Sequence, residues 1–319
     1  THRMFEPMYG SIVLEMVSDS PAGELLGETT KDYMFECCGE KLDMAQLQEI
    51  WESKLEPVYP YRKAGSSVEK IDGQLAAPAA PKIGVAKPKV IIPVFPGTNC
   101  EYDTAKAFAR AGADPEILVI RNLTPADVTA SCEALVKAIG ESQIVMLPGG
   151  FSGGDEPDGS AKFIASFFRS PAVTEAVRDL LQHRDGLMLG ICNGFQALIK
   201  LGLVPYGDIR PITAYDPTLT FNTIGRHQSM LVRTRVASTG SPWLSHCDAG
   251  SEYEIAISHG EGRFVAPQNV LDQLVANGQV ATQYVDLEGE PTMDQRYNPN
   301  GSLLAIEGIT SPEDRKSVV

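Results

Sequence analysis

One cysteine of the chain has the neighbours that a catalytic nucleophile requires. Cys192 is the central residue of GICNG (residues 190–194), which has the G-x-nucleophile-x-G spacing of a nucleophile elbow. A short apolar run, 187–189, precedes it and a helical pattern from Gly194 to Leu201 follows, so the strand and the helix that flank such an elbow are both predicted. The N–H groups at the start of that helix favour a thiolate. We therefore interpret Cys192 as a nucleophile, although a lone cysteine is more often a buried core residue.

The same turn offers hydrogen-bond donors for an oxyanion. The backbone N–H of Asn193, at the start of the helix, is expected to donate to a negative charge that develops beside the sulfur. A second donor is expected from the loop after a neighbouring strand, and PGG (residues 148–150) follows the apolar run 144–147. The sequence therefore predicts a cysteine nucleophile with two backbone donors for an oxyanion beside it.

A cysteine nucleophile needs a histidine as base and a third group that orients the imidazole. His259 directly follows an apolar strand pattern and belongs to SHGEGRF (residues 258–264). In an extended segment residues two apart face the same way, so Glu261 is expected to hydrogen-bond the His259 ring, although a random His-x-Glu is usually a solvated surface pair. The predicted triad is Cys192, His259 and Glu261. The remaining histidines lie near a chain end, beside charged residues or in polar loops, and they are His2, His183, His227 and His246.

The elements that must position these residues alternate regularly after residue 90. Short apolar runs predict strands, and the stretches between them carry helix starts such as TPAD (residues 124–127), which has a capping-box-like pattern. The strands expected before the elbow are 90–95, 117–120, 144–147 and 187–189. Buried strands that alternate with helices are typical of a parallel sheet covered on both faces, with ligands at the carboxyl ends of the strands. Beyond Tyr206 the pattern predicts further strands at 230–232, 253–257, 280–285 and 303–306.

The composition changes abruptly between about residues 64 and 89. This stretch is rich in Ala, Pro, Gly and Ser and has few large apolar side chains, so it is interpreted as a linker between residues 1–63 and a main domain, residues 90–319. In the first piece the apolar residues of MAQLQEIWESKL (residues 44–55) recur at helical spacing. About sixty residues with one amphipathic helix make a poor independent domain. We therefore interpret residues 1–63 as a segment that docks on a larger body.

Charge and composition narrow the function classes. With a formal net charge of -14 and a pI near 4.8, the chain is expected to repel nucleic-acid phosphates and anionic lipid. No apolar stretch approaches membrane-spanning length, and the first residues lack the features of a signal peptide. Irregularly spaced cysteines fit a reducing cytosol, and the adjacent Cys37 and Cys38 lack the histidines of a zinc site. We expect a cytoplasmic enzyme without a metal, and a chain that starts with Thr1 looks like part of something longer.

Several motifs together resemble one family of glutamine amidotransferases. LGICNGFQ with LGLVP, the earlier PGTNCEYD and PGGFSGGDEPDGSA, and the later SHGEGRF are similar to the glutaminase domain of phosphoribosylformylglycinamidine (FGAM) synthases, over about residues 90–309. MFEPMYGSIVLEM and LEPVYPYR resemble the last part of the synthetase region in the single-chain form of these enzymes. The resemblance implies an α/β fold, a class I amidotransferase-like (flavodoxin-like) parallel-sheet sandwich with a strand-rich C-terminal part, preceded by a synthetase tail.

The resemblance also implies a reaction and roles for particular residues. L-Glutamine is hydrolysed to glutamate through a γ-glutamyl thioester on Cys192, with His259 as general base and acid and Glu261 as its orienting carboxylate. The N–H groups of Asn193 and Gly150 stabilise the oxyanion, and the side chain of Gln196 helps to hold the substrate. The ammonia passes to the synthetase domain of the same enzyme, where ATP and Mg²⁺ activate formylglycinamide ribonucleotide. No cofactor is expected in the present segment.

One departure and two rival interpretations accompany the resemblance. Family members continue after ITSPEDR (residues 309–315) with a glycine-rich strand, a His-Ser-Glu-Arg or His-Pro-Glu-Arg segment and a final helix, so a chain that ends at Val319 is expected to be truncated in this domain. A truncated module could dock on a synthetase without turnover, in keeping with the lack of a GxxxxGK[ST] motif. A different cysteine hydrolase of the elbow type would share Cys192 without requiring Glu261.

Overall fold

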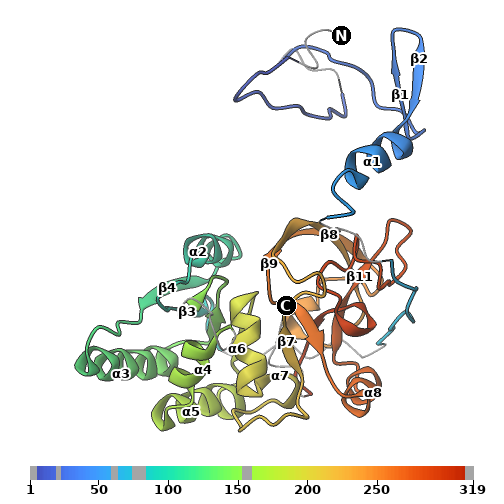
Figure 1. Ribbon diagram of the computed structural model, residues 1–319. Helices are drawn as coiled ribbons and strands as arrows, with labels where there is room; N and C mark the ends of the chain where they lie inside the picture. Colours follow the sequence, from blue (N-terminus) through green and yellow to red (C-terminus); the bar gives the residue numbers. More distant parts are fainter. Residues whose placement is uncertain (1–5, 19–22, 59–63, 74–83, 153–159, 313–319) are drawn as a thin grey trace. The chain divides into compact units, whose positions relative to one another are not determined.

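The computed structural model describes residues 6–18, 23–58, 64–73, 84–152 and 160–312 (Figure 1). The chain divides into two compact units, Thr1–Arg62 and Lys63–Val319, and each is described by itself. Within the described residues, no helix is long and apolar enough to cross a membrane. The same residues contain no group of three or more His, Cys, Asp or Glu side chains placed to hold a metal ion.

The described part of the first unit contains a hairpin and one helix. β1 (Met34–Cys37) pairs antiparallel with β2 (Glu40–Asp43), and α1 (Met44–Ser53) follows directly. The carboxylate of Asp43 caps α1 by accepting two N–H groups of its first turn. The helix predicted from the apolar spacing is confirmed, but none of its residues is buried, and Trp51 is 81% exposed. The apolar face of α1 is therefore uncovered by its own unit.

The first half of the second unit is a parallel sheet with helices on both faces (Figure 1). The strand order is β4-β3-β5-β6, and every neighbouring pair is parallel. The strands are β3 (Lys89–Val94), β4 (Asp114–Val119), β5 (Ile144–Leu147) and β6 (Leu187–Gly190), and the helices are α2 (Glu101–Arg110), α3 (Pro125–Glu141), α4 (Lys162–Phe168), α5 (Pro171–Arg178) and α6 (Asn193–Leu201). The predicted parallel α/β architecture is confirmed.

Neighbouring residues of the central strand point into two different cores. Ile91 belongs to the larger core, which includes side chains of α3, α4 and α6. Val90 and Ile92 belong to a smaller core on the opposite face, against which Phe108 of α2 packs. Because both faces of the sheet are covered, such strands are apolar at successive positions rather than at alternate ones. This explains why the uninterrupted apolar runs of the sequence predicted the sheet correctly.

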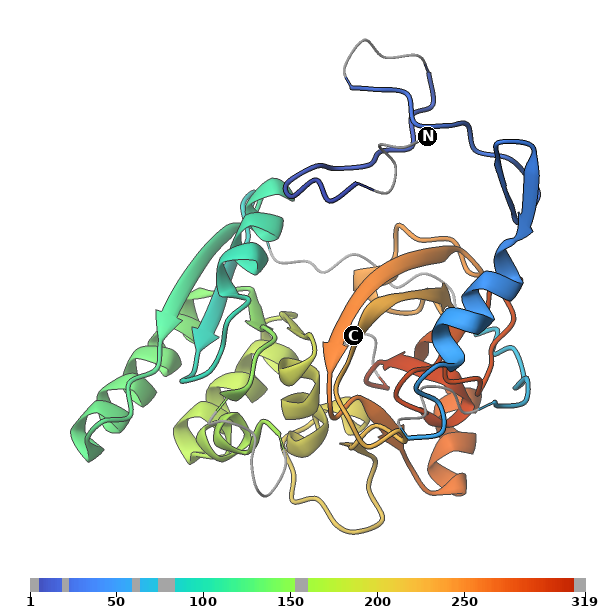
Figure 2. The ribbon, with the colours of Figure 1, turned by 45° about the horizontal axis from the view of Figure 1, so that its top comes forward.

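The second half of this unit is built on an antiparallel sheet of strand order β12-β11-β8-β9 (Figure 2). Its strands are β8 (Gln228–Val236), β9 (Glu252–His259), β11 (Val280–Val285) and β12 (Ile306–Ile309). A separate pair is formed by β7 (Thr218–Thr220) and β10 (Arg263–Val265). The remaining helical elements are α7 (Leu203–Tyr206), α8 (Gln268–Ala276), a π-helical turn η3 (Asp179–His183) and the 3-10 turns η4 (Pro242–Leu244) and η5 (Leu303–Ala305).

The strand predicted at 303–306 is largely wrong. Residues Leu303–Ala305 form the turn η5, and the strand β12 begins at Ile306. Leu304 and Ala305 have φ values of 52° and 55°, which no extended strand can accommodate. Their apolar side chains nevertheless pack into the interior, so an apolar run alone could not distinguish this tight turn from a strand.

The first part of the expected linker is packed against the antiparallel sheet. Within the second unit, Ser67 and Gly73 form isolated bridges with Thr292 and Ser238. The side chain of Ile71 is buried, and its N–H donates to Oε1 of Gln283 at 2.9 Å. Arg235 on β8 forms an ion pair with the segment as well. The composition of residues 64–73 did not predict that they pack on the sheet, because backbone hydrogen bonds attach them more than large apolar side chains do. Residues 74–83 lie outside the described residues.

Candidate active site

The nucleophile elbow is formed as predicted. Cys192 lies between the end of β6 and the start of α6, and its φ of 53° places it in the left-handed region. A non-glycine residue in this region costs about 1–3 kcal/mol and is typical of a functional turn. The two glycines allow the turn to be tight. A Cβ on Gly194 would lie 1.9 Å from the carbonyl oxygen of Leu147, and a Cβ on Gly190 would lie 2.6 Å from the carbonyl oxygen of Gly194.

Asn193 attaches the start of α6 to the loop after β5. Its side chain is almost completely buried, and Oδ1 accepts the N–H of Ser152 at 3.2 Å. Its Nδ2 donates to Oε1 of Gln196 at 2.9 Å. This side chain therefore fixes the loop that carries the predicted second oxyanion donor relative to the helix that carries the first.

The loop at residues 148–150 lies against the nucleophile. A Cβ on Gly149 would lie 3.4 Å from the Cβ of Cys192. Gly150 has a φ of 142°, and a Cβ there would lie 2.7 Å from the carbonyl oxygen of Gly97, so only glycine fits. The structure thus brings the Gly150 backbone to the elbow, where the sequence predicted an oxyanion donor. The donor role of its N–H, like that of the Asn193 N–H, stays a prediction.

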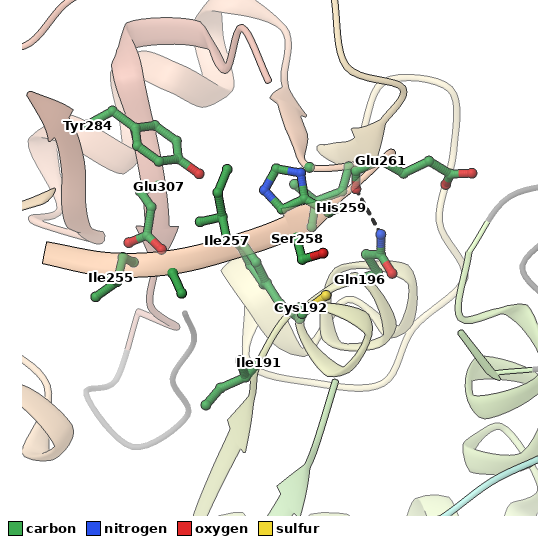
Figure 3. A pocket seen from close by; sticks show the side chains of 14 residues that line it. Ile191, Cys192, Gln196, Ile255, Ile257, Ser258, His259, Glu261, Tyr284 and Glu307 are labelled. Atoms are coloured by element: carbon green, nitrogen blue, oxygen red, sulfur yellow. Dashed lines mark hydrogen bonds between the residues drawn. The ribbon is translucent and has the colours of Figure 1, made fainter. Parts of the chain in front are cut away.

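Cys192 opens into a pocket of about 630 Å³, which is continuous with solvent (Figure 3). Elbow, sheet and turn residues all contribute to its walls, which are lined by Ile191, Cys192, Phe195, Gln196, Leu219, Ile255, Ala256, Ile257, Ser258, His259, Glu261, Gly262, Tyr284 and Glu307. The pocket therefore brings together Cys192, His259, Glu261 and Gln196, which the sequence had singled out.

His259 is the last residue of β9, and its ring faces the pocket. The ring nitrogen Nδ1 is buried and has no hydrogen-bond partner within the described residues. Burial lowers the pKa of His259, and the nearby His227 lowers it further. A neutral imidazole, the form that can accept a proton from a thiol, is therefore favoured at neutral pH.

The Glu261 carboxylate does not reach the His259 ring in this structure. Its Oε2 accepts the N–H and the hydroxyl of Ser160, at 3.1 and 2.8 Å. The expectation of a hydrogen bond to the ring assumed an extended segment, but β9 ends at His259 and the chain turns. The ring lies over Gly262, where a Cβ would come within 2.4 Å of it. Figure 3 shows the Glu261 side chain directed away from the imidazole.

Gln196 lines the pocket, but both polar atoms of its side chain are engaged by the protein. Oε1 accepts from Asn193, and Nε2 donates to the carbonyl oxygen of Glu261 at 2.8 Å. The residue therefore joins the elbow helix to the turn after β9. Its predicted contact with the substrate stays untested, and the structure gives it a visible positioning role instead.

Asn222 is a site residue that the sequence did not reveal. It is 3% exposed and binds both sides of the turn that follows His259. Its Nδ2 donates to the carbonyl oxygen of His259 at 2.8 Å, its Oδ1 accepts the N–H of Gly262 at 3.2 Å, and its own N–H donates to the carbonyl oxygen of Gly260 at 2.9 Å. The residues it binds lie about forty positions away, so no local spacing in the sequence marks it.

Two further site residues were missed. Tyr284 lies in the strand predicted at 280–285, and Glu307 lies one residue beyond the strand predicted at 303–306. Tyr284 on β11 and Glu307 on β12 both line the pocket. Tyr284 accepts a hydrogen bond from Nδ2 of Asn300 at 3.0 Å, and the Glu307 carboxylate accepts one from the hydroxyl of Thr282. An acidic residue in the middle of an apolar strand was the available signal.

The chain is similar to known glutamine amidotransferases. Residues 87–319 match the family model described as CobB/CobQ-like glutamine amidotransferase domain. A phosphoribosylformylglycinamidine synthase subunit PurQ of Halobacterium salinarum is 34% identical over 226 residues, which cover 70% of this chain and 86% of the relative. The PurQ subunit of Symbiobacterium thermophilum is 36% identical over 221 residues, covering 68% and 79%.

A solved structure shares the fold. One chain of the structure of PurLQS from Thermotoga maritima aligns with a TM-score of 0.52 and 24% sequence identity, covering 72% of this chain and 85% of that chain. The alignment supports the architecture described above, a parallel sheet followed by an antiparallel one.

Proposed function

The chain belongs to the glutamine amidotransferase family that includes the PurQ subunits of phosphoribosylformylglycinamidine synthase, and from this premise we propose that Cys192 hydrolyses L-glutamine to supply ammonia for purine biosynthesis. The observation that carries the proposal is the elbow. Cys192 stands at the start of α6 in a pocket that it shares with the half-buried imidazole of His259. The ammonia would convert formylglycinamide ribonucleotide to the amidine, FGAM.

The proposed reaction begins when the Cys192 thiol gives its proton to His259 and its sulfur attacks the side-chain amide carbon of glutamine. The N–H groups of Asn193 and Gly150 stabilise the resulting oxyanion. When the tetrahedral intermediate collapses, His259 returns the proton to the leaving nitrogen, so ammonia departs and a γ-glutamyl thioester remains. Water then attacks the thioester with His259 again as base, and glutamate is released.

Glu261 is proposed as the carboxylate that orients the imidazole. The buried Nδ1 of His259 has no partner within the described residues, which leaves an acceptor position for a carboxylate open. Glu261 would have to exchange its bonds to Ser160 for a bond to this nitrogen. In its present position Glu261 attaches the turn after β9 to Ser160, two residues before α4.

The experiment that tests the proposal is covalent labelling of the intact chain with a glutamine analogue that carries an electrophilic carbon in place of the amide. Peptide mapping should place the label on Cys192, and Cys192→Ala should abolish it. Cys132→Ala is the matched control, because Cys132 is also half-buried but contacts Ser170 outside the pocket. Folded wild-type protein that stays unlabelled would favour the rival proposal of a non-catalytic docking module.

Residues 1–63 are proposed to be the tail of the synthetase region of a single-chain enzyme, with 64–89 as the junction and 90–319 as the amidotransferase domain. The family match starts only at residue 87, and the exposed apolar face of α1 is suited to a protein partner. The partner would be the synthetase, whose site would use ATP and Mg²⁺, and the enzyme would be cytoplasmic. Replacing Trp51 by Ala should weaken binding of the chain to a separately produced synthetase; unchanged binding would argue against this assignment.

A further inference from the structure

We infer that Glu307 recognises the α-ammonium group of the amino-acid substrate, at the end of the pocket away from Gln196 and Glu261. The inference rests on the proposed glutaminase function and adds to it the residue that distinguishes an amino acid from other primary amides. Glu307 and Tyr284 lie together on one side of the pocket, and His259 lies between them and Glu261 (Figure 3).

Among the described residues, the Glu307 carboxylate has no cationic partner. It lies on β12, and its hydrogen bond within the described residues comes from the hydroxyl of Thr282. None of the ion pairs formed by described Lys, Arg or His side chains involves it. The side chain of Glu307 is partly buried. A partly buried carboxylate without a counter-ion is costly, because a hydroxyl replaces only part of its lost hydration. A ligand that brings a positive charge would remove that cost.

The Glu307 carboxylate and the Cys192 nucleophile belong to one site. Both line the same pocket. The Tyr284 hydroxyl also lies within the electrostatic influence of both groups, because burial, the charge on Glu307 and the charge on Cys192 all raise the pKa of Tyr284. The phenol therefore stays neutral, and its oxygen accepts a hydrogen bond from Nδ2 of Asn300.

The shape of glutamine also matches the arrangement of groups along the pocket. Its amide carbon and its α-nitrogen are separated by three carbon atoms, a span of about 5 Å in an extended conformation. Figure 3 shows Ile257 between His259 and Glu307, and Ile255 beside Glu307. Both side chains line the pocket and suit the methylene groups of such a chain. A molecule with an amide at one end and an ammonium at the other therefore matches the order of groups along the pocket.

Burial also gives the recognition a pH dependence. Desolvation raises the pKa of Glu307, whereas a bound ammonium favours its charged form. Binding of the cation therefore releases a proton from the fraction of Glu307 that is protonated. The preference for substrates with an ammonium should be strongest above the raised pKa and should decline as the pH falls through it. The other ionisable groups that line the pocket are Cys192, His259, Glu261 and Tyr284.

The test compares two electrophilic glutamine analogues that differ only in the α-ammonium, which one of them replaces by hydrogen. Their rates of labelling Cys192 are measured on the intact chain and on Glu307→Gln, which keeps the shape and an oxygen for Thr282. The wild-type protein should react faster with the ammonium-bearing analogue. In Glu307→Gln the ratio of the two labelling rates should fall by about 10- to 100-fold. The fall should come only from slower labelling by the ammonium-bearing analogue. Glu254→Gln is the matched control, because Glu254 lies on β9 outside the pocket.

Each outcome decides something. Equal slowing of both analogues in Glu307→Gln would reduce Glu307 to a structural residue, and an unchanged preference would place ammonium recognition elsewhere. Failure of wild type to react with either analogue would overturn the proposed glutaminase function itself. If Glu307→Gln does not fold, the wild-type preference is measured against pH. A preference that declines toward acidic pH supports the inference, and one that does not change with pH contradicts it.

Discussion

The two walls of the pocket are built in different ways. On the elbow wall, Cys192, its flanking glycines and the first turn of α6 are consecutive in sequence, and the turn is fixed by contacts with β5 directly below it. On the opposite wall, His259 lies at the end of an antiparallel strand, and residues distant in sequence, among them Asn222 and Ser160, hold the turn that follows it. The first wall is specified locally, whereas the second depends on the assembly of the whole domain.

The largest expected effect tests whether the second wall supplies the base. His259→Ala should lower the rate of thioester formation by about 10²- to 10⁴-fold, because no other proposed group takes the proton from Cys192. Rapid mixing with glutamine and quantification of the acyl-enzyme measures this step. Unchanged thioester formation would remove His259 from the mechanism.

A smaller effect is expected when the turn is loosened without removing the imidazole. Asn222→Ala deletes the side-chain bonds to His259 and Gly262, so kcat should fall by about 10-fold or more while KM changes less. The matched control is Gln279→Ala, since Gln279 is an equally buried amide that binds the carbonyl oxygens of Pro205 and Thr310 outside the pocket. Equal losses of activity in both variants would indicate general destabilisation rather than positioning.

Glu261 can orient the His259 imidazole or only anchor the turn after β9, and substitutions of Glu261 and of its partner Ser160 separate these two roles. If Glu261 orients the imidazole during turnover, Glu261→Gln should lower kcat by about 10-fold or more, and Ser160→Ala should have little effect. If Glu261 only anchors the turn, both variants should lose similar, modest amounts of activity and stability. Steady-state kinetics together with thermal unfolding of the two variants distinguishes these results.

The smallest effect is a displacement of the acid limb of the pH profile. Burial lowers the pKa of His259, so its neutral, basic form persists to a lower pH than that of an exposed histidine. The acid limb of kcat/KM should therefore lie below the ordinary histidine value, and activity should be lost as the pH falls through the lowered pKa. His227→Gln removes one cause of the lowering and should move this limb upward.

The difference between the walls also explains what the sequence could predict. The four strands of the parallel sheet and the elbow were predicted because each reflects burial on both faces or a spacing of two residues around Cys192. The bonding of Glu261 to Ser160 could not be predicted, since the partners are separated by 101 positions. The turn at Leu304 was missed because an apolar residue in the left-handed region cannot be distinguished by its type from an apolar residue of a strand.

The packing of residues 64–73 affects the reach of whatever precedes them. A flexible tether that began at β3 would have let a preceding unit explore a radius that grows with the roughly 25 residues of the compositional linker. Because Ile71 is buried and Gly73 is bridged to Ser238, the attachment point lies instead on the antiparallel sheet. Residues 74–89 therefore do not set how far a preceding segment can reach from its attachment point, and lengthening the chain after residue 73 should leave that reach unchanged.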